Sequence, residues 1–138
     1  MPYPPAIQQF VDSIGLLDRP ERIQALIDLG KSFKPPARPQ PYPEDHRVPG
    51  CESEVFTWCT LQNGRLKIEV AVENPQGLSA MALAALLEEG LEGQPPSAAD
   101  SLDDDLVYAL FGRELGMGKA MGLANTVRQI RAQAAKLT

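Results

Sequence analysis

The chain has 138 residues and a formal net charge of −5, and 43% of its residues are hydrophobic. This length suits a single domain over residues 1–138, and the hydrophobic content excludes disorder from lack of apolar residues. The acidic balance argues against nucleic acid as a partner, because phosphate contacts need clustered Lys and Arg. No apolar run reaches the roughly 20 residues that span a bilayer, and the N-terminus lacks the pattern of a secretory signal. We therefore expect a cytoplasmic protein with reduced thiols and no membrane partner.

The first third of the chain predicts two helices. Residues 6–17 place apolar side chains on one helical face. Asp18, with Glu21 three residues later, forms a capping-box pattern that starts a second helix, and Pro35 ends it. The apolar faces that we expect to be buried are Ile7, Phe10, Val11 and Ile14 in the first helix, and Ile23, Leu26 and Ile27 in the second.

Residues 34–49 contain six prolines and predict an extended connector. Proline removes backbone donors and fixes φ, so this composition disfavours both helix and sheet. A loop of this length inside a compact domain is usually functional. The connector leads directly to Cys51.

A β-hairpin is the clearest pattern in the sequence. Asn63-Gly64 is a type I′ turn signature between two strand-like runs, and a two-residue turn pairs Gln62 with Arg65. Counting outward from that pair puts Cys59 opposite Ile68. One face, which we expect to be the core, then carries Val55, Thr57, Cys59, Leu61, Leu66, Ile68, Val70 and Val72.

The C-terminal half predicts three further helices. Residues 78–91 are apolar nearly all round, which is typical of a buried helix. The seven carboxylates of residues 88–105 we expect mostly in solvent, and residues 103–111 predict a short helix. The glycine-punctuated residues 112–122 precede a last helix, whose buried stripe is Leu123, Val127, Ile130 and Ala134. The predicted fold class is α+β, a small antiparallel sheet packed with several helices.

Both cysteines, and the only histidine, lie in or near the hairpin. Cys59 is interpreted as a small core hydrophobe, because free cysteine is among the most buried residue types. Cys51 lies outside the paired strands and is either tucked under the connector or functional. A closed metal site usually has four ligands, and His46 with the two cysteines offers three, so no metal site is predicted. A cysteine hydrolase would need His46 as a base beside the thiol, whereas a lone loop histidine is more often structural.

The stretch RVPGCESEVF, residues 47–56, resembles the active-loop motif of SufE-type sulfur-acceptor proteins of iron–sulfur cluster assembly. The preceding helix RIQALIDLGKSF, the hairpin, the apolar helix and the last helix follow the order of that family. The resemblance extends from about residue 6 to residue 135, and it implies a fold related to that of cluster scaffold proteins. It assigns the working cysteine to Cys51, with loop support from His46, Arg47, Gly50, Ser53 and Lys119.

The resemblance implies a function in sulfur transfer. A cysteine desulfurase, SufS-like or CsdA-like, would hold sulfur as a persulfide and pass it to Cys51, which stimulates the desulfurase. A scaffold complex that builds iron–sulfur clusters would be the recipient. The protein itself would need no cofactor, because pyridoxal phosphate belongs to the desulfurase, and it would act as a carrier rather than a stand-alone enzyme. A monomer and a homodimer both remain open.

The sequence departs from the pattern of the family at two places. Glu52 and Glu54 stand where many members have glutamines, and carboxylates beside a thiol disfavour its thiolate unless they point away. Lys119 stands where members often carry the arginine of an Arg-x-Asn-Gly stretch, so the charge is kept without the planar guanidinium. Two alternative functions stand beside sulfur transfer: a metal- or cluster-binding scaffold, and a desulfurase regulator that carries no sulfur.

Overall fold

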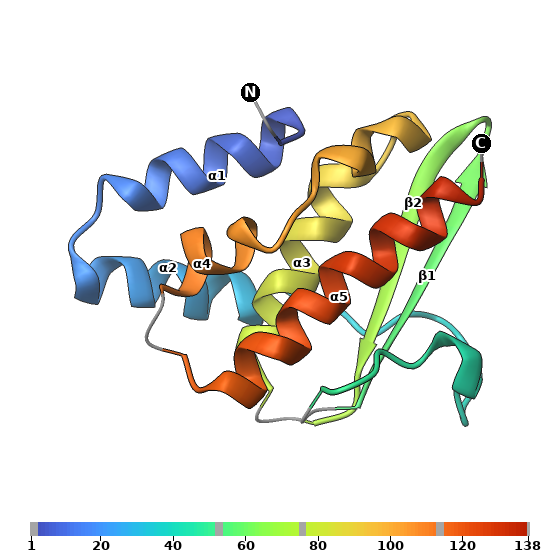
Figure 1. Cartoon of the computed structure of the whole chain (residues 1–138). Helices are drawn as coiled ribbons and strands as arrows, with labels where there is room; N and C mark the ends of the chain where they lie inside the picture. Colours follow the sequence, from blue (N-terminus) through green and yellow to red (C-terminus); the bar gives the residue numbers. More distant parts are fainter. Residues whose placement is uncertain (1–2, 52–53, 75–76, 113–114, 138) are drawn as a thin grey trace.

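The computed structural model describes residues 3–51, 54–74, 77–112 and 115–137. These residues form five α-helices, two short 3-10 helices and a two-stranded antiparallel sheet, which confirms the predicted α+β class (Figure 1). Within these ranges, no helix has the length and apolar character to cross a membrane. The elements are α1 (Pro5–Gly15), α2 (Arg19–Lys31), η1 (Glu44–His46), β1 (Val55–Gln62), β2 (Arg65–Val72), α3 (Leu78–Leu91), η2 (Pro96–Ser101), α4 (Asp105–Phe111) and α5 (Met117–Ala135).

The hairpin has the predicted register. Gln62 pairs with Arg65 and Cys59 with Ile68, out to Val55 and Val72 at the open end. Asn63 and Gly64 have φ values of 56° and 77°. Two consecutive left-handed residues are what a type I′ turn requires, so the turn chemistry fixes the register.

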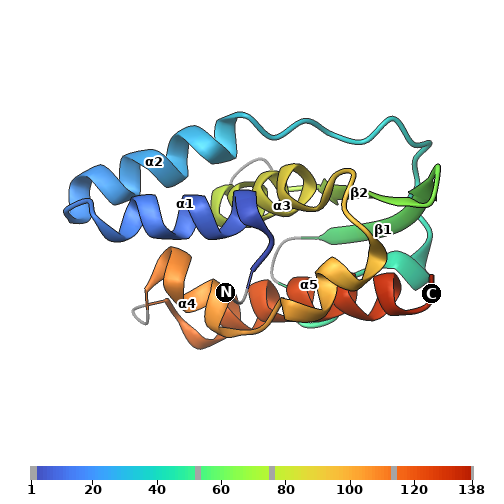
Figure 2. The ribbon, with the colours of Figure 1, turned by 90° about the horizontal axis from the view of Figure 1, so that it is seen from above.

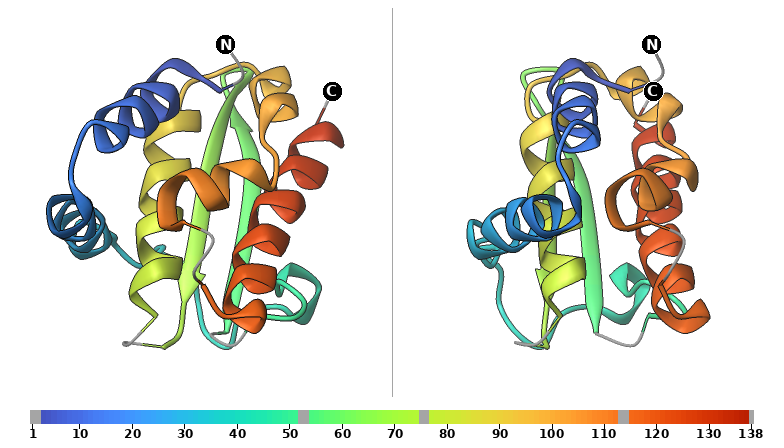
Figure 3. Two further views of the ribbon diagram at one scale, coloured as in Figure 1. Left: turned by 60° about the vertical axis from the view of Figure 1, so that its left-hand side comes forward. Right: turned by 90° about the vertical axis from the view of Figure 1, so that its left-hand side faces the viewer.

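Two helices cover the predicted core face of the hairpin. In Figures 1 and 3, α3 lies along β2 and α5 lies along β1. The helices α1 and α2 pack outside α3, and α4 contacts α1 and α5. The hydrophobic core joins the hairpin to both covering helices and includes Val55, Leu66, Ile68 and Val70 from the strands, Leu83 and Leu87 from α3, and Leu123, Val127 and Ile130 from α5.

The opposite face of the hairpin is buried as well, by the connector of residues 34–49. Figure 2 shows this segment running from the end of α2 past the sheet. Tyr42 packs its ring 5.2 Å from that of Phe56 and 5.5 Å from that of Trp58. The guanidinium of Arg38 lies over Trp58 and donates to Glu69 of β2 at 2.7 Å. The proline-rich segment is therefore a second layer that fixes where the chain enters β1.

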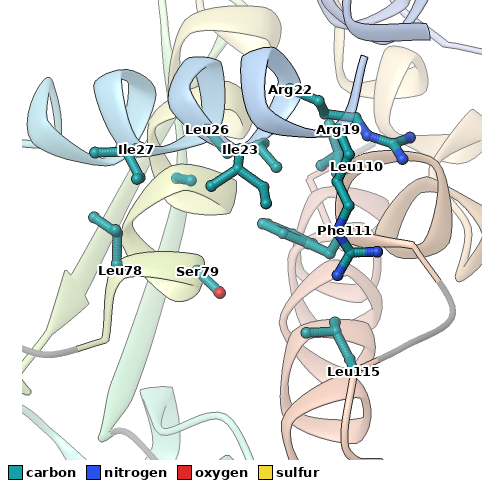
Figure 4. A pocket seen from close by; sticks show the side chains of 11 residues that line it. Arg19, Arg22, Ile23, Leu26, Ile27, Leu78, Ser79, Leu110, Phe111 and Leu115 are labelled. Carbon is teal, nitrogen blue, oxygen red and sulfur yellow. The ribbon is translucent and has the colours of Figure 1, made fainter. Parts of the chain in front are cut away.

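The apolar face of α2 is less buried than predicted, although its capping box is present. Ile23 is 46% exposed, and Leu26 and Ile27 are half-buried. The reason is geometric, because these side chains line an open groove of about 400 Å³ between α2, α3 and α4 (Figure 4). Leu61, which we expected in the core, is also 40% exposed because it lies beside the hairpin turn.

The last helix begins earlier than the glycine pattern predicted. Helix α5 starts at Met117, so Gly118 and Gly122 lie inside it. Its buried residues nevertheless include the whole predicted stripe of Leu123, Val127, Ile130 and Ala134. The second glycine has a specific packing role that is described with the functional site below.

Glu88 is an exception to the expected solvent exposure of the carboxylates of residues 88–105, most of which are exposed. Its half-buried side chain accepts a hydrogen bond from the backbone N–H of Val70 at 3.1 Å. This bond satisfies a donor on the outer edge of β2. Burial, together with the neighbouring carboxylates of Glu69, Glu89 and Glu92, raises the pKa of Glu88 from its ordinary value of 4.5 to about 7, although the Val70 bond lowers it.

We predict that Glu88 makes the stability of the fold decrease as the pH rises from 4.5 to 7. Between these values the folded chain keeps a proton that the unfolded chain has lost, so raising the pH favours unfolding. Glu88→Gln keeps an acceptor for Val70 and should be more stable than the wild type at pH 8 by about 1–2 kcal/mol, after allowance for solvent screening.

Urea unfolding at several pH values between 4 and 8 measures this difference. The advantage of Glu88→Gln should shrink as the pH approaches 4.5. Glu89→Gln is the matched control, because that side chain is exposed on the same helix. A stability difference for Glu88→Gln that does not vary with pH would contradict the prediction.

Candidate functional site

Cys51 belongs to a short segment after the connector, which we call the cysteine loop (residues 49–51). The loop follows Val48, which is 2% exposed and donates its N–H to the carbonyl of Val55 at 2.8 Å. The loop is therefore tethered to the core at its start, whereas Pro49 and Gly50 are exposed. Cys51 itself is half-buried and packs at the edge of the core.

The thiol lies against the backbone of α5 at Gly122. A Cβ atom at residue 122 would be 2.9 Å from the Cα of Cys51 and 3.0 Å from its Sγ. Contacts this short with a side chain do not occur in relaxed structures, so glycine is required for the approach. The glycine inside α5 therefore gives Cys51 its resting position.

Gly50 has a conformational requirement of its own. Its φ is +69°, in the left-handed region that costs other residues about 1–2 kcal/mol. An added Cβ would also lie 3.1 Å from the Nδ2 of Asn125. The cysteine loop thus turns at a residue that combines an unusual backbone conformation with a close approach to α5.

Polar side chains of α5 hold the loop and the end of the connector, and we call Asn125, Gln129 and Gln133 the α5 clamp. Asn125 donates from Nδ2 to the carbonyl of Pro49 at 2.8 Å. Gln129 donates from Nε2 to the carbonyl of His46 at 2.8 Å and to the hydroxyl of Thr57 at 2.9 Å. That hydroxyl donates to Gln133, which donates back to the Thr57 carbonyl. The clamp joins α5, β1 and the connector.

His46 takes part in this arrangement as a positioned ring. Its Nδ1 lies 2.8 Å from the carbonyl oxygen of Thr57, and since a carbonyl only accepts, Nδ1 carries the proton. The ring stacks on Trp58 with centroids 5.2 Å apart. This N–H therefore faces a backbone carbonyl of β1, which fits the structural interpretation of a lone loop histidine.

Arg47, the nearest cation to Cys51 in the sequence, is engaged by carboxylates. It donates to Glu44 at 2.8 Å and forms an ion pair with Glu54 at 2.9 Å. The hydrogen bond with Glu44, followed by that with Glu54, raises the pKa of Arg47 above its ordinary value. The Glu54 carboxylate thus shares Arg47 with Glu44. Glu52 and Ser53 lie outside the described residues.

The thiol of Cys59 is not a nucleophile at neutral pH. Cys59 is half-buried on the predicted core face, and its Sγ lies 3.5 Å from the carbonyl of Ile130. Burial raises the pKa of Cys59 to about 12. Since the thiolate is the nucleophile, Cys59 is almost entirely unreactive at neutral pH.

The remaining predictions concern Lys119 and the possible metal ligands. Lys119 is exposed in the first turns of α5 and forms no hydrogen bond or ion pair within the described chain, so its supporting role stays a prediction. No group of three His, Cys, Asp or Glu side chains with metal-binding geometry occurs among the described residues. The groove in Figure 4 is lined by other elements and does not include Cys51.

Sequence reasoning missed Gly122 and the α5 clamp, although a pattern was present. Gly122, Asn125, Gln129 and Gln133 follow each other at intervals of three, four and four residues, which places them on one helical face. This polar face runs beside the apolar stripe that sequence analysis identified. A second stripe of amides next to a buried stripe predicts a helix that packs against backbone carbonyls.

The chain matches a known protein family over most of its length. The sequence profile described as "SufE: Fe-S metabolism associated domain" matches residues 8–134. The chain therefore belongs to the SufE family, and its role is in iron–sulfur metabolism. The family resemblance seen in the sequence is thus confirmed.

The fold is similar to the solution structure of a hypothetical protein from Thermus thermophilus. The two chains share 25% sequence identity with a TM-score of 0.81, and the match covers 98% of this chain and 97% of the other. A search of curated proteins found no match.

We predict that Asn125→Ala increases the accessibility of Cys51. The substitution removes the hydrogen bond to Pro49, and such a bond contributes about 0.5–1.5 kcal/mol, so the loop should open about two- to tenfold more often. The labelling rate of the Cys51 thiol by a disulfide reagent, followed on the Cys51 peptide by mass spectrometry, measures the change. Gln24→Ala on α2 removes a comparable exposed amide and should leave the rate unchanged. An unchanged rate in Asn125→Ala would show that this bond does not restrain the loop.

Proposed function

We propose that this protein is a persulfide carrier that takes sulfur from a cysteine desulfurase onto Cys51. The observation that carries the proposal is the placement of Cys51 on a short loop tethered at Val48 and resting on Gly122. The loop is anchored at its base, where Val48 donates to the carbonyl of Val55, and the proposal is that Cys51 leaves its place on α5 when the donor docks. Membership of the SufE family, with its role in iron–sulfur metabolism, supports the same conclusion.

The chemistry requires only one thiolate on this chain. The sulfur of Cys51 attacks the outer sulfur of the desulfurase persulfide, and a new sulfur–sulfur bond forms on Cys51. The sulfur–sulfur bond of the donor breaks, and its cysteine leaves as a thiolate. No net oxidation occurs and no metal takes part. Pyridoxal phosphate would belong to the desulfurase, and a cluster-building scaffold would receive the sulfur.

Separation of the two thiols favours a carrier over an internal redox pair. Cys59 faces α5 from within the hairpin and has a raised pKa, whereas Cys51 lies outside the strands. A persulfide on Cys51 would release its sulfur if a reactive thiol attacked it from the same chain. Because the thiol of Cys59 stays protonated at neutral pH, it would not attack a persulfide on Cys51.

We predict that incubation with a cysteine desulfurase and L-cysteine adds one sulfur atom to Cys51. Intact-mass and peptide mass spectrometry locate the added sulfur. Cys51→Ser should gain none, and it should lose the stimulation of desulfurase turnover. Cys59→Ser is the matched control and should load as the wild type does.

Two results would contradict the role of persulfide carrier and support one of the alternative functions. Stimulation of the desulfurase that persists in Cys51→Ser would indicate a regulator that carries no sulfur. Iron or zinc retained in stoichiometric amount by the purified protein, and lost in Cys51→Ser, would indicate a metal- or cluster-binding scaffold.

We also predict that Gly50→Ala speeds sulfur loading. An alanine at this left-handed position strains the resting loop by about 1–2 kcal/mol, and its Cβ approaches Asn125, so the loop should leave its resting position on α5 more readily. Gly93→Ala is the matched control, because Gly93 has a φ of +75° but open space around it. Single-turnover loading measures the effect. If Gly50→Ala loads at the wild-type rate, the conformational role of Gly50 is wrong.

A further inference from the structure

The first turns of α5 expose apolar side chains that the fold does not need. Met117 is 82% exposed and Met121 is 51% exposed. They are separated by one helical turn and share a face with Ala120 and Ala124. Together with Tyr108 of α4 they border a shallow groove of about 490 Å³. We call these five residues the methionine surface, which consists of Tyr108, Met117, Ala120, Met121 and Ala124.

The two exposed methionines lie apart from the buried side of α5, whereas Ala124 also packs against the core. The core contacts of the helix come from residues such as Leu123 and Val127, which are at most 2% exposed. Single exposed apolar residues are common on protein surfaces, but a contiguous group beside a reactive residue indicates an interaction site.

The methionine surface is continuous with the cysteine loop. A Cβ at Gly50 would lie 3.7 Å from the Sδ of Met121. The next residue in the helix is Gly122, on which Cys51 rests. Figures 1 and 3 show the segment that leads to β1 lying beside the start of α5.

Sulfur transfer determines what must cover this surface. The attacking and donating sulfur atoms have to come into contact, so the donor protein must bury the surroundings of Cys51. A standard interface covers about 800 Å² on each partner, which is a patch roughly 30 Å across. The Sδ of Met121 lies 3.7 Å from the place that a Cβ of Gly50 would take, and Met117 is only one turn, about 5.4 Å, from Met121 along the helix. Both side chains therefore fall inside the footprint of any protein that reaches Cys51.

We propose that the methionine surface is the apolar anchor on which the cysteine desulfurase docks. This inference rests on the proposed function, because it takes the desulfurase as the donor of sulfur. Methionine side chains are flexible and polarisable, so they can adapt to a partner while the loop beside them moves. The ion pair of Arg128 with Asp104 borders the groove and supplies the polar rim that is typical around such an anchor. The complementary surface on the desulfurase would be apolar and adjacent to its persulfide cysteine.

Binding and loading are measured separately to test this inference. Binding to the immobilised desulfurase is measured with Cys51→Ser as the background, so that sulfur transfer does not affect the result. Adding Met117→Ser and Met121→Ser should raise the dissociation constant about tenfold or more. Met117→Ser alone should raise it severalfold. Leu16→Ser is the matched control, because Leu16 is 89% exposed at the end of α1 and should change binding less than twofold.

Loading is then followed with Cys51 intact at increasing protein concentration. The double methionine variant should need about tenfold more protein for half-maximal loading, with a nearly unchanged rate at saturation. Equal binding by the wild type and both methionine variants would overturn the docking role while leaving sulfur transfer to Cys51 intact. Methionine-dependent binding without any sulfur on Cys51 would instead overturn the proposed function and keep the docking surface. A wild-type dimer that the methionine substitutions dissociate, with unchanged desulfurase binding, would assign the surface to self-association and overturn the inference.

Discussion

The hydrogen bonds between α5 and the start of β1 are the constraint on which the functional site depends. Thr57 is fully buried, and its hydroxyl and carbonyl are both bonded to amides of Gln129 and Gln133. The same carbonyl faces the ring of His46, so one strand residue joins the helix and the connector. A buried polar group that lost its partners would cost about 1–3 kcal/mol. The network therefore fixes the rotation of α5 about its axis, and that rotation turns Gly122 toward Cys51.

Much of the fold could be predicted because its strongest determinants are local. The Asn63-Gly64 turn fixes the hairpin register, and Asp18 with Glu21 starts α2. The apolar stripe of α5 was visible at helical spacing. The partial exposure of Ile23 was not predictable in this way, because periodicity indicates which side of a helix is apolar, whereas burial depends on how closely α3 and α4 approach it. Glu88 escaped prediction for the same reason, since its partner Val70 is on another element.

In the candidate site, too, local features could be predicted from the sequence and long-range contacts could not. From the residues alone, Cys51 was either tucked under the connector or functional, and its working role, with the support of Gly50, is implied by the resemblance to the SufE family and stays a prediction. The role of Gly122 depends on a contact across 71 positions in the chain, and one sequence contains no record of that contact. The buried second face of the hairpin, where Phe56 and Trp58 meet Tyr42, was also missed. When a strand alternates apolar and polar residues, the polar face is usually assigned to solvent. In this protein the proline-rich connector covers that face of the hairpin.

The contacts around Cys51 differ in strength from those around its supports, and this difference suits a carrier. Val48 and Val55, on either side of the loop, are almost fully buried and share a backbone hydrogen bond. Between them, the described restraints on the loop include one amide bond from Asn125 and the packing of Cys51 on Gly122. The hydrogen bond from Asn125, worth about 1 kcal/mol, can break many times without unfolding the protein, whereas the buried supports cannot separate in this way. The loop can therefore exchange between a sheltered and an extended position while its base, and with it the reach of the thiol, stays constant.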